Sequence, residues 1–242
     1  MTGAVKGAGY FIRGLALLRA PGVRRWVAIP LAINTVLFAA AIALGAQQFG
    51  QLVDWLLSFL PGWLDWLQFL LWPLFALFAL VVTFFAFTVV ANLVGAPFNG
   101  LLAEAVERHL RGAPPVDTGG WAAVLRDALP ALVDELRKLA YFLLWGIPLL
   151  LLTLVPVVNL AAPFLWAWFS AWMLALEYGD YPMGNHGLRF AEQRRRLRRR
   201  LPLTLGFGAA VAVATLVPLF NFLVMPAAVA GASALWSEQL AE

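Results

Sequence analysis

The sequence predicts an all-α integral membrane protein, and three observations lead to that fold class. Hydrophobic residues make up 62% of the 242-residue chain and charged residues only 12%, about half the charged share of soluble domains. The run from Trp66 to Ala103 contains no charged residue, whereas one spanning helix needs only about 20 apolar residues. Two later apolar stretches carry the same Thr-Leu-Val-Pro break. We expect two long transmembrane helices, two proline-broken helical hairpins and amphipathic cytoplasmic helices in a single domain, 1–242.

The amino-terminal segment is expected to form a helix at the membrane interface. Residues 5–20 mix aromatic and aliphatic side chains with three basic residues, and no small-residue cleavage site follows a short apolar core, as a signal peptide requires. "WVAIPLAINTVLFAAAIALGA", residues 26–46, is the first predicted span, interrupted by Pro30. The amino terminus is therefore read as part of the folded protein.

The second predicted span is residues 66–94, separated from the first by a loop at 47–65. That loop contains tryptophan and aspartate but no lysine or arginine, which is typical of the outer membrane interface. The second span is longer than one crossing needs, so tilt, a kink or projection from the bilayer is expected. Residues 95–138 are predicted to be a cytoplasmic helical segment that continues directly into the next apolar stretch.

Two hairpins are predicted at 139–177 and 202–238. Each contains Thr-Leu-Val-Pro with an asparagine three residues after the proline, and proline interrupts a helix because it lacks a donor and clashes with the preceding turn. Two interpretations remain open: full spans joined by short outer turns, or hairpins inserted only partway. We expect partial insertion because both turns are apolar around the break, and polar backbone at membrane depth is tolerated inside protein.

The basic residues fall in three blocks, 6–25, 108–138 and 189–200. Positive loops face the cytoplasm, so both termini of this multi-pass chain are predicted to be cytoplasmic. The linker at 178–201 includes "RFAEQRRRLRRR" with seven arginines. On a membrane protein such a block contacts anionic membrane lipids rather than nucleic acid.

The residue types needed for catalysis do not form a recognisable pattern. The chain has no cysteine, so thiolate chemistry is excluded. His109 and His186 lie in different segments without a metal-binding spacing, and no nucleophile elbow or phosphate-binding loop is present. We predict no catalytic residue, no metal and no cofactor, and the protein is not expected to be an enzyme.

The stretch "PGVRRW" is the strongest candidate binding site. Arg24 and Arg25 follow Pro21 and Gly22 directly, where a helix that begins near Val23 would leave several backbone N–H groups unpaired. An anion there would meet those donors, the positive end of the helix dipole and two guanidinium groups. The alternative is that the arginine pair only orients the following span.

Polar residues that recur near membrane level indicate a conduit more than an inert anchor, because a polar side chain in hydrocarbon is costly. Individually, helix packing remains the favoured role of each asparagine. The candidates for lining a pore are Asn34, Asn99, Glu104 and Glu107.

Four segments stand in order between about Tyr10 and Trp236: "PGVRRWVAIPL", "ANLVGAPFNGLLAE", "FSAWMLALEYGDYPMGNH" and "PLFNFLVMPAAVAGASALW". They carry a resemblance to the CysZ family of proteobacterial inner-membrane sulfate permeases. It implies sulfate import for cysteine biosynthesis without an ATP-binding subunit, partly inserted hairpins and a homo-oligomer. It also implies sulfate binding at Gly22, Val23, Arg24 and Arg25. The alternative is a non-transporting scaffold or anionic-lipid-binding protein.

Overall fold

In the computed structural model, helix is the only regular secondary structure of the described residues, which are 3–59, 61–64, 66–112, 120–217 and 220–241. Side chains are described in these ranges except at 64, 68, 83–97, 120–132, 221 and 222. Among the described residues, three helices are long and apolar enough to cross a membrane: Arg25–Leu57, Val133–Thr153 and Val158–Asn185. The prediction of an all-α membrane protein is confirmed.

The chain divides into two compact units, residues 28–98 and residues 1–27 with 99–242. The helices are α1 (Gly3–Leu17), α2 (Arg25–Leu57), η1 (Gly62–Leu64), α3 (Leu67–Arg111), α4 (Gly120–Thr153), η2 (Val158–Ala161), α5 (Ala162–Asn185), α6 (Phe190–Arg199), α7 (Leu201–Thr215), α8 (Asn221–Leu235) and η4 (Trp236–Leu240).

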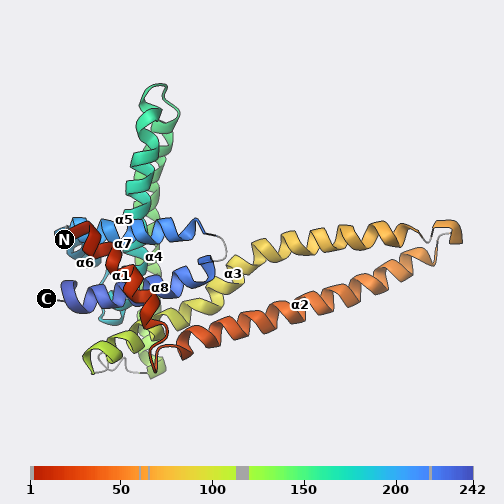
Figure 1. The fold of residues 1–242 in the computed structure, drawn as a ribbon, viewed down its shortest axis with the longest axis horizontal. Coiled ribbons are helices and arrows are strands. Elements are labelled where there is room, and N and C mark those ends of the chain that lie inside the picture. The colour runs from red at the N-terminus through yellow and green to blue at the C-terminus, as the bar shows by residue number, and fades with distance from the viewer. Residues whose placement is uncertain (1–2, 60, 65, 113–119, 218–219, 242) are drawn as a thin grey trace. The chain divides into compact units, whose positions relative to one another are not determined.

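The unit formed by residues 28–98 is an antiparallel pair made by α2 and the first part of α3 (Figure 1). The Phe49 ring stacks on Phe75 with centroids 4.3 Å apart and meets the Trp72 ring edge-on at 5.3 Å. These contacts explain a difference from the prediction. The first span was expected to end at residue 46, but α2 continues to Leu57, because residues 47–57 contain no proline and place Phe49 against the neighbouring helix.

The predicted second span and the short helix after it form one 45-residue helix, α3. Pro73 lies within it, and transmembrane helices tolerate proline where neighbouring groups satisfy the freed carbonyl. The side chains of 83–97, and with them most of the second half of the predicted span, lie outside the described residues.

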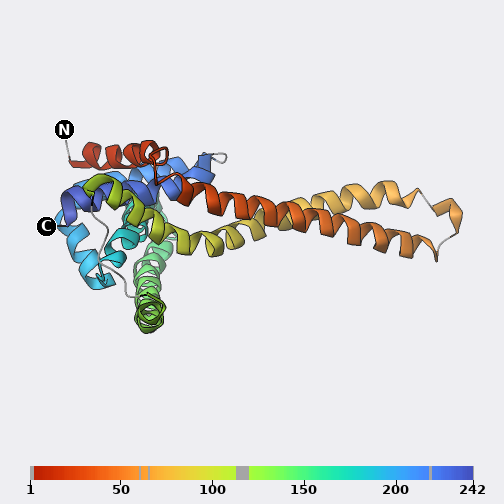
Figure 2. The same ribbon diagram turned by 90° about the horizontal axis from the view of Figure 1, so that it is seen from below.

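In the larger unit, glycines allow three helix pairs to pack with their backbones close together. Figure 2 shows α1 lying along α7 and α8. A Cβ atom on Gly7 would collide with the Leu203 carbonyl of α7, and one on Gly14 with the Ala227 carbonyl of α8. Gly208 similarly approaches the Ala171 carbonyl, where α7 crosses α5. Small residues at such crossings bring helices into van der Waals contact, which drives helix association in membranes.

The two proline-broken hairpins differ in the length of their arms. In the first hairpin, α4 and α5 run side by side (Figure 1), and the chain reverses at Val157, whose φ is 70°. Its arms are long enough to span. The arms of the second, α7 and α8, have 15 residues each and so measure about 22 Å. That is short of a hydrocarbon core of about 30 Å. Pro218 lies outside the described residues.

The basic segment predicted as a linker is largely helical. α5 extends to Asn185 and α6 follows after a short turn. Three residues on one face of α6 are buried: Phe190, Gln193 and Leu197. The reason is that apolar or amide side chains recur every three or four residues among the arginines, so one face of the helix packs against the core.

Candidate anion-binding site

The turn that precedes α2 has an open, glycine-dependent geometry. The Ala20 carbonyl accepts hydrogen bonds from the amides of both Val23 (3.1 Å) and Arg24 (3.2 Å). Gly22 has a φ of +84°, a conformation that favours glycine. A Cβ atom added there would meet nothing within 4 Å. The backbone at Gly22 therefore faces open space, through which an anion can approach it.

Val23 fixes this turn to the core of the larger unit. Its side chain is fully buried and belongs to the same apolar cluster as Leu102 and Val106 of α3. The two arginines that follow are exposed. The fold therefore holds the backbone of the turn in place while it presents both guanidinium groups outward.

Arg24 and Arg25 retain the capacity to bind an anion. The Arg25 guanidinium lies over the Trp26 ring, 5.0 Å from its centroid, and this stacking leaves the N–H edges in the guanidinium plane free to donate. Within the described residues, neither arginine forms an ion pair with a carboxylate. Two positive charges beside an open glycine backbone favour binding of a small oxyanion.

The number of unpaired amides is smaller than the sequence predicted. The amides of Trp26 and Val27 donate to the carbonyls of Val23 (3.0 Å) and Arg24 (3.3 Å), because the helix opens with a tight turn. In the described part of the chain, the Gly22 and Arg25 amides have no backbone acceptor. An anion here would be held by two guanidinium groups and these two amides.

The predicted pore-lining residues lie in different surroundings. Asn34 is buried in α2, within the unit of residues 28–98, and its Oδ1 has no hydrogen-bond partner among the described residues. The other three belong to the larger unit. Asn99 is buried and donates to the Tyr181 hydroxyl at 3.2 Å. Glu104 is partly exposed and forms a helical ion pair with Arg108.

Glu107 is the one predicted residue that carries a buried ionisable group. Its side chain is 3% exposed, and its Oε2 lies 2.7 Å from the Nε2 of His186. Its Oε1 is buried without a partner in the described residues. Burial raises the pKa of Glu107 above its ordinary value of 4.5, and the hydrogen bond with His186 opposes that rise. His186, considered above as a metal ligand, therefore pairs with a carboxylate that lies far from it in the sequence.

This raised pKa predicts a pH-dependent stability. A carboxyl group whose folded-state pKa is raised stabilises the fold below its ordinary pKa, and the contribution is lost as the pH rises through the raised value. Glu107→Gln, which stays neutral, should therefore gain stability relative to the parent as the pH is raised from below the ordinary carboxyl pKa of 4.5 through the raised value. Thermal unfolding of both proteins in detergent across this range measures the difference. A difference that is constant with pH would contradict this interpretation.

The sequence alone did not reveal a second charge cluster, in which one buried lysine is surrounded by more exposed carboxylates. Lys138 of α4 is 9% exposed, and its Nζ lies 2.9 Å from Asp180, 3.2 Å from Glu177 and 3.0 Å from Glu135. Gln193 of α6 also donates to Asp180, at 2.6 Å. Glu177 and Asp180 are three residues apart and so share a face of α5, which is the signal that could have indicated this cluster. The ion pairs join α4 to α5, and the Gln193 bond adds α6.

Comparison with known proteins matches nearly the whole chain to the family that its sequence segments resemble. The family model described as "Sulfate transporter CysZ/Etoposide-induced protein 2.4" matches residues 10–226. A sulfate transporter CysZ of Pseudomonas paraeruginosa is 46% identical over 99% of this chain and 97% of its own. One from Pseudomonas fluorescens Pf-5 is 48% identical over 96% and 93%. One from Pectobacterium atrosepticum is 44% identical over 96% and 85%.

These names are those of transporters and not of enzymes, in agreement with the sequence interpretation. The match covers the Gly22–Arg25 turn, the buried Glu107–His186 pair, the first hairpin and the second hairpin as far as Pro226. The helical membrane fold, the residues matched and the identity of these relatives together show that the chain belongs to the sulfate transporter CysZ/etoposide-induced protein 2.4 family.

Proposed function

We propose that this protein is a sulfate permease of the bacterial inner membrane that imports sulfate for cysteine biosynthesis. Relatives named sulfate transporters, similar along nearly their whole length, support sulfate as the transported ion. The observation that carries the capture step is the turn at Gly22, where open backbone and two exposed guanidinium groups adjoin.

Capture at this turn replaces part of the hydration shell of sulfate with charge-assisted hydrogen bonds. The two arginines are exposed and do not enclose the ion. Binding should therefore be weak enough for the ion to leave again, as conduction requires. Val23, which is buried, contributes by holding the turn rather than by touching the ion.

We propose that sulfate moves from the turn past Asn99, Glu104 and Glu107. Ionised carboxylates would repel this anion, so the negative charge of the two glutamates must be reduced. Arg108 pairs with Glu104, and His186 pairs with Glu107, so each carboxylate has a basic partner. The raised pKa of Glu107 also favours its neutral form. Asn34, which lies in the unit of residues 28–98, is also proposed to line the pathway. The route is proposed to be completed within a homo-oligomer.

Sulfate flux into liposomes that contain only this protein tests the function. The expected result is saturable uptake of radiolabelled sulfate that empty liposomes lack. Liposomes that contain the Glu107→Gln variant show whether uptake needs the buried carboxyl group. An absence of uptake from correctly folded, reconstituted protein would contradict the proposal.

The second candidate function is a non-transporting membrane scaffold that binds anionic lipid. The arginine-rich α6 is the observation that favours it, since five of its ten residues are arginine. The same liposome experiment separates the two functions, because a scaffold associates with anionic lipid without sulfate flux.

A further inference from the structure

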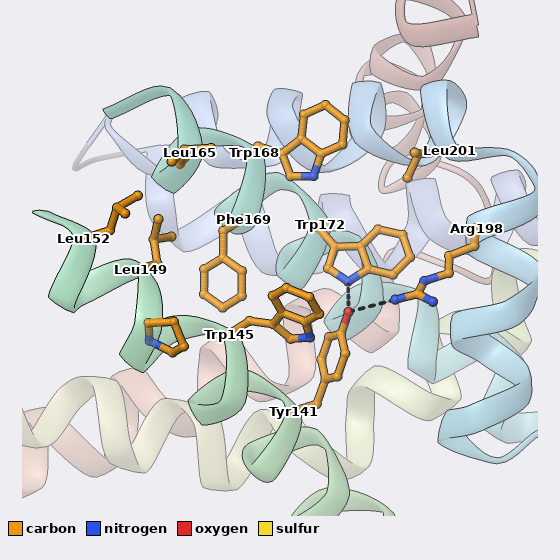
Figure 3. Close-up of a pocket in the computed structure, with 11 residues that line it drawn as sticks. Tyr141, Trp145, Leu149, Leu152, Leu165, Trp168, Phe169, Trp172, Arg198 and Leu201 are labelled. Carbon is orange, nitrogen blue, oxygen red and sulfur yellow. Dashed lines mark hydrogen bonds between the residues drawn. The ribbon is translucent and has the colours of Figure 1, made fainter. Parts of the chain in front are cut away.

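A large apolar cavity lies between α4 and α5, with an arginine at one end (Figure 3). Its volume is about 640 Å³, within the range of small-ligand pockets. Its walls are aromatic and aliphatic side chains, from Tyr141, Trp145, Pro148, Leu149 and Leu152 of α4, from Leu165, Trp168, Phe169 and Trp172 of α5, and from Leu201 of α7. Arg198 of α6 completes the lining.

The polar atoms at the arginine end of the cavity are already hydrogen-bonded to one another. The indole N–H of Trp172 donates to the Tyr141 hydroxyl at 3.2 Å, and the Arg198 guanidinium donates to the same oxygen at 3.4 Å. The remaining wall is largely hydrocarbon. Such a cavity favours an apolar chain over a hydrated solute, because burying apolar surface is favourable and burying unpaired polar groups is costly.

A strongly basic hollow adjoins this cavity and shares Arg198 with it. The hollow has a volume of about 420 Å³ and is lined by Arg194, Arg195, Arg198 and Arg199 with Ala191. Glu192 lies 3.4 Å from Arg195. Among the described residues, the other three arginines have no carboxylate within ion-pairing distance. The hollow therefore has a large excess of positive charge.

Aromatic rings hold two of these guanidinium groups in place. Arg194 lies over the rings of Tyr141 (5.0 Å) and Phe190 (5.6 Å), and Arg198 lies over Trp172 at 5.9 Å. Stacking orients the flat face of each guanidinium and leaves N–H edges for bidentate contacts with phosphate. Trp and Tyr beside Arg are also typical of the level at which lipid headgroups lie.

We propose that the cavity and the hollow form one binding site for an anionic phospholipid. One acyl chain occupies the aromatic cavity, and the phosphate binds at Arg198 with Arg194 and Arg199. A headgroup that carries an ammonium would be repelled by four arginines, so the site selects an anionic lipid such as phosphatidylglycerol over a zwitterionic one. A free sulfate ion would use the hollow and leave the apolar cavity unfilled. This site is separate from the Gly22 turn.

Native mass spectrometry of delipidated protein, with phosphatidylglycerol or phosphatidylcholine added back, tests the site. The parent protein should retain phosphatidylglycerol in preference to phosphatidylcholine. Arg198→Gln removes a charge from an exposed position and should weaken phosphatidylglycerol binding about tenfold. Lys6→Gln, which makes the same charge change on exposed Lys6 of α1, should bind like the parent.

Leu149→Trp tests the cavity independently, because it fills the space for the chain and leaves every arginine in place. It should weaken phosphatidylglycerol binding as Arg198→Gln does, while gel filtration shows an unchanged oligomer. The proposal is overturned by equal retention of the two lipids, or by parent-like binding in Arg198→Gln. Displacement of the lipid by added sulfate at millimolar concentration would also overturn it, in favour of a free-anion site.

Discussion

Replacing both Arg24 and Arg25 with alanine is expected to reduce sulfate uptake by about 100-fold at low sulfate concentration. Each guanidinium supplies hydrogen bonds of the charged kind, worth about 1.5–3 kcal/mol, and every 1.4 kcal/mol is about tenfold in affinity. Both side chains are exposed, so their removal should leave the core intact. Initial rates of radiolabelled sulfate uptake into proteoliposomes measure the effect.

A matched variant separates anion binding from membrane orientation. Arg24→Lys with Arg25→Lys keeps both positive charges, and therefore the orientation signal, but lacks the planar guanidinium fork. If the pair binds sulfate, the lysine variant should insert like the parent and still lose about tenfold in uptake. If the pair only orients the chain, the lysine variant should transport like the parent. That outcome would contradict the proposed capture site.

Gly14→Ala is expected to destabilise the larger unit strongly. Its Cβ would collide with backbone atoms of Ala227 and Gly231 on α8, so the helices would have to separate. We expect a loss of about 2 kcal/mol or more, since overpacking commonly costs about 1–3 kcal/mol. For a chain of this size, that lowers the midpoint of thermal unfolding by about 5 °C.

Gly9→Ala is the matched control, because Gly9 lies on the same helix and a Cβ there would meet nothing within 4 Å. Alanine has the higher helix propensity, so this variant should gain up to about 1 kcal/mol. The two variants differ only in what the new methyl group touches. Thermal unfolding in detergent should therefore shift in opposite directions. Equal shifts would show that α1 does not pack on α8 at Gly14.

The membrane class and the helix breaks could be predicted from sequence because both depend on local physical chemistry. An uncharged run such as 66–103 is stable as a helix in hydrocarbon whatever its neighbours are. The reversal near Pro156 similarly follows from the missing donor and the fixed ring of proline. The first predicted span is shorter than α2, because the last part of α2 is stabilised by packing of Phe49 against Trp72 and Phe75 of α3.

The candidate site was only partly predictable. The adjacency of Gly22, Arg24 and Arg25 is visible in the sequence, since the three lie within one turn. Which backbone amides remain unpaired could not be predicted, because this depends on the geometry of the turn, in which the Ala20 carbonyl accepts hydrogen bonds from two amides. The pairing of Glu107 with His186 joins residues 79 positions apart, and no local pattern specifies such a contact.

The sequence by itself determined that this protein is helical, lies in a membrane and carries two adjacent arginines at the start of a long helix. These properties follow from hydropathy, proline and local charge, which act over a few residues. Only the tertiary structure decided which polar groups are buried together and where apolar side chains line a cavity beside Arg198. Those features depend on close helix crossings, and the burial they create is set by residues far apart in the chain.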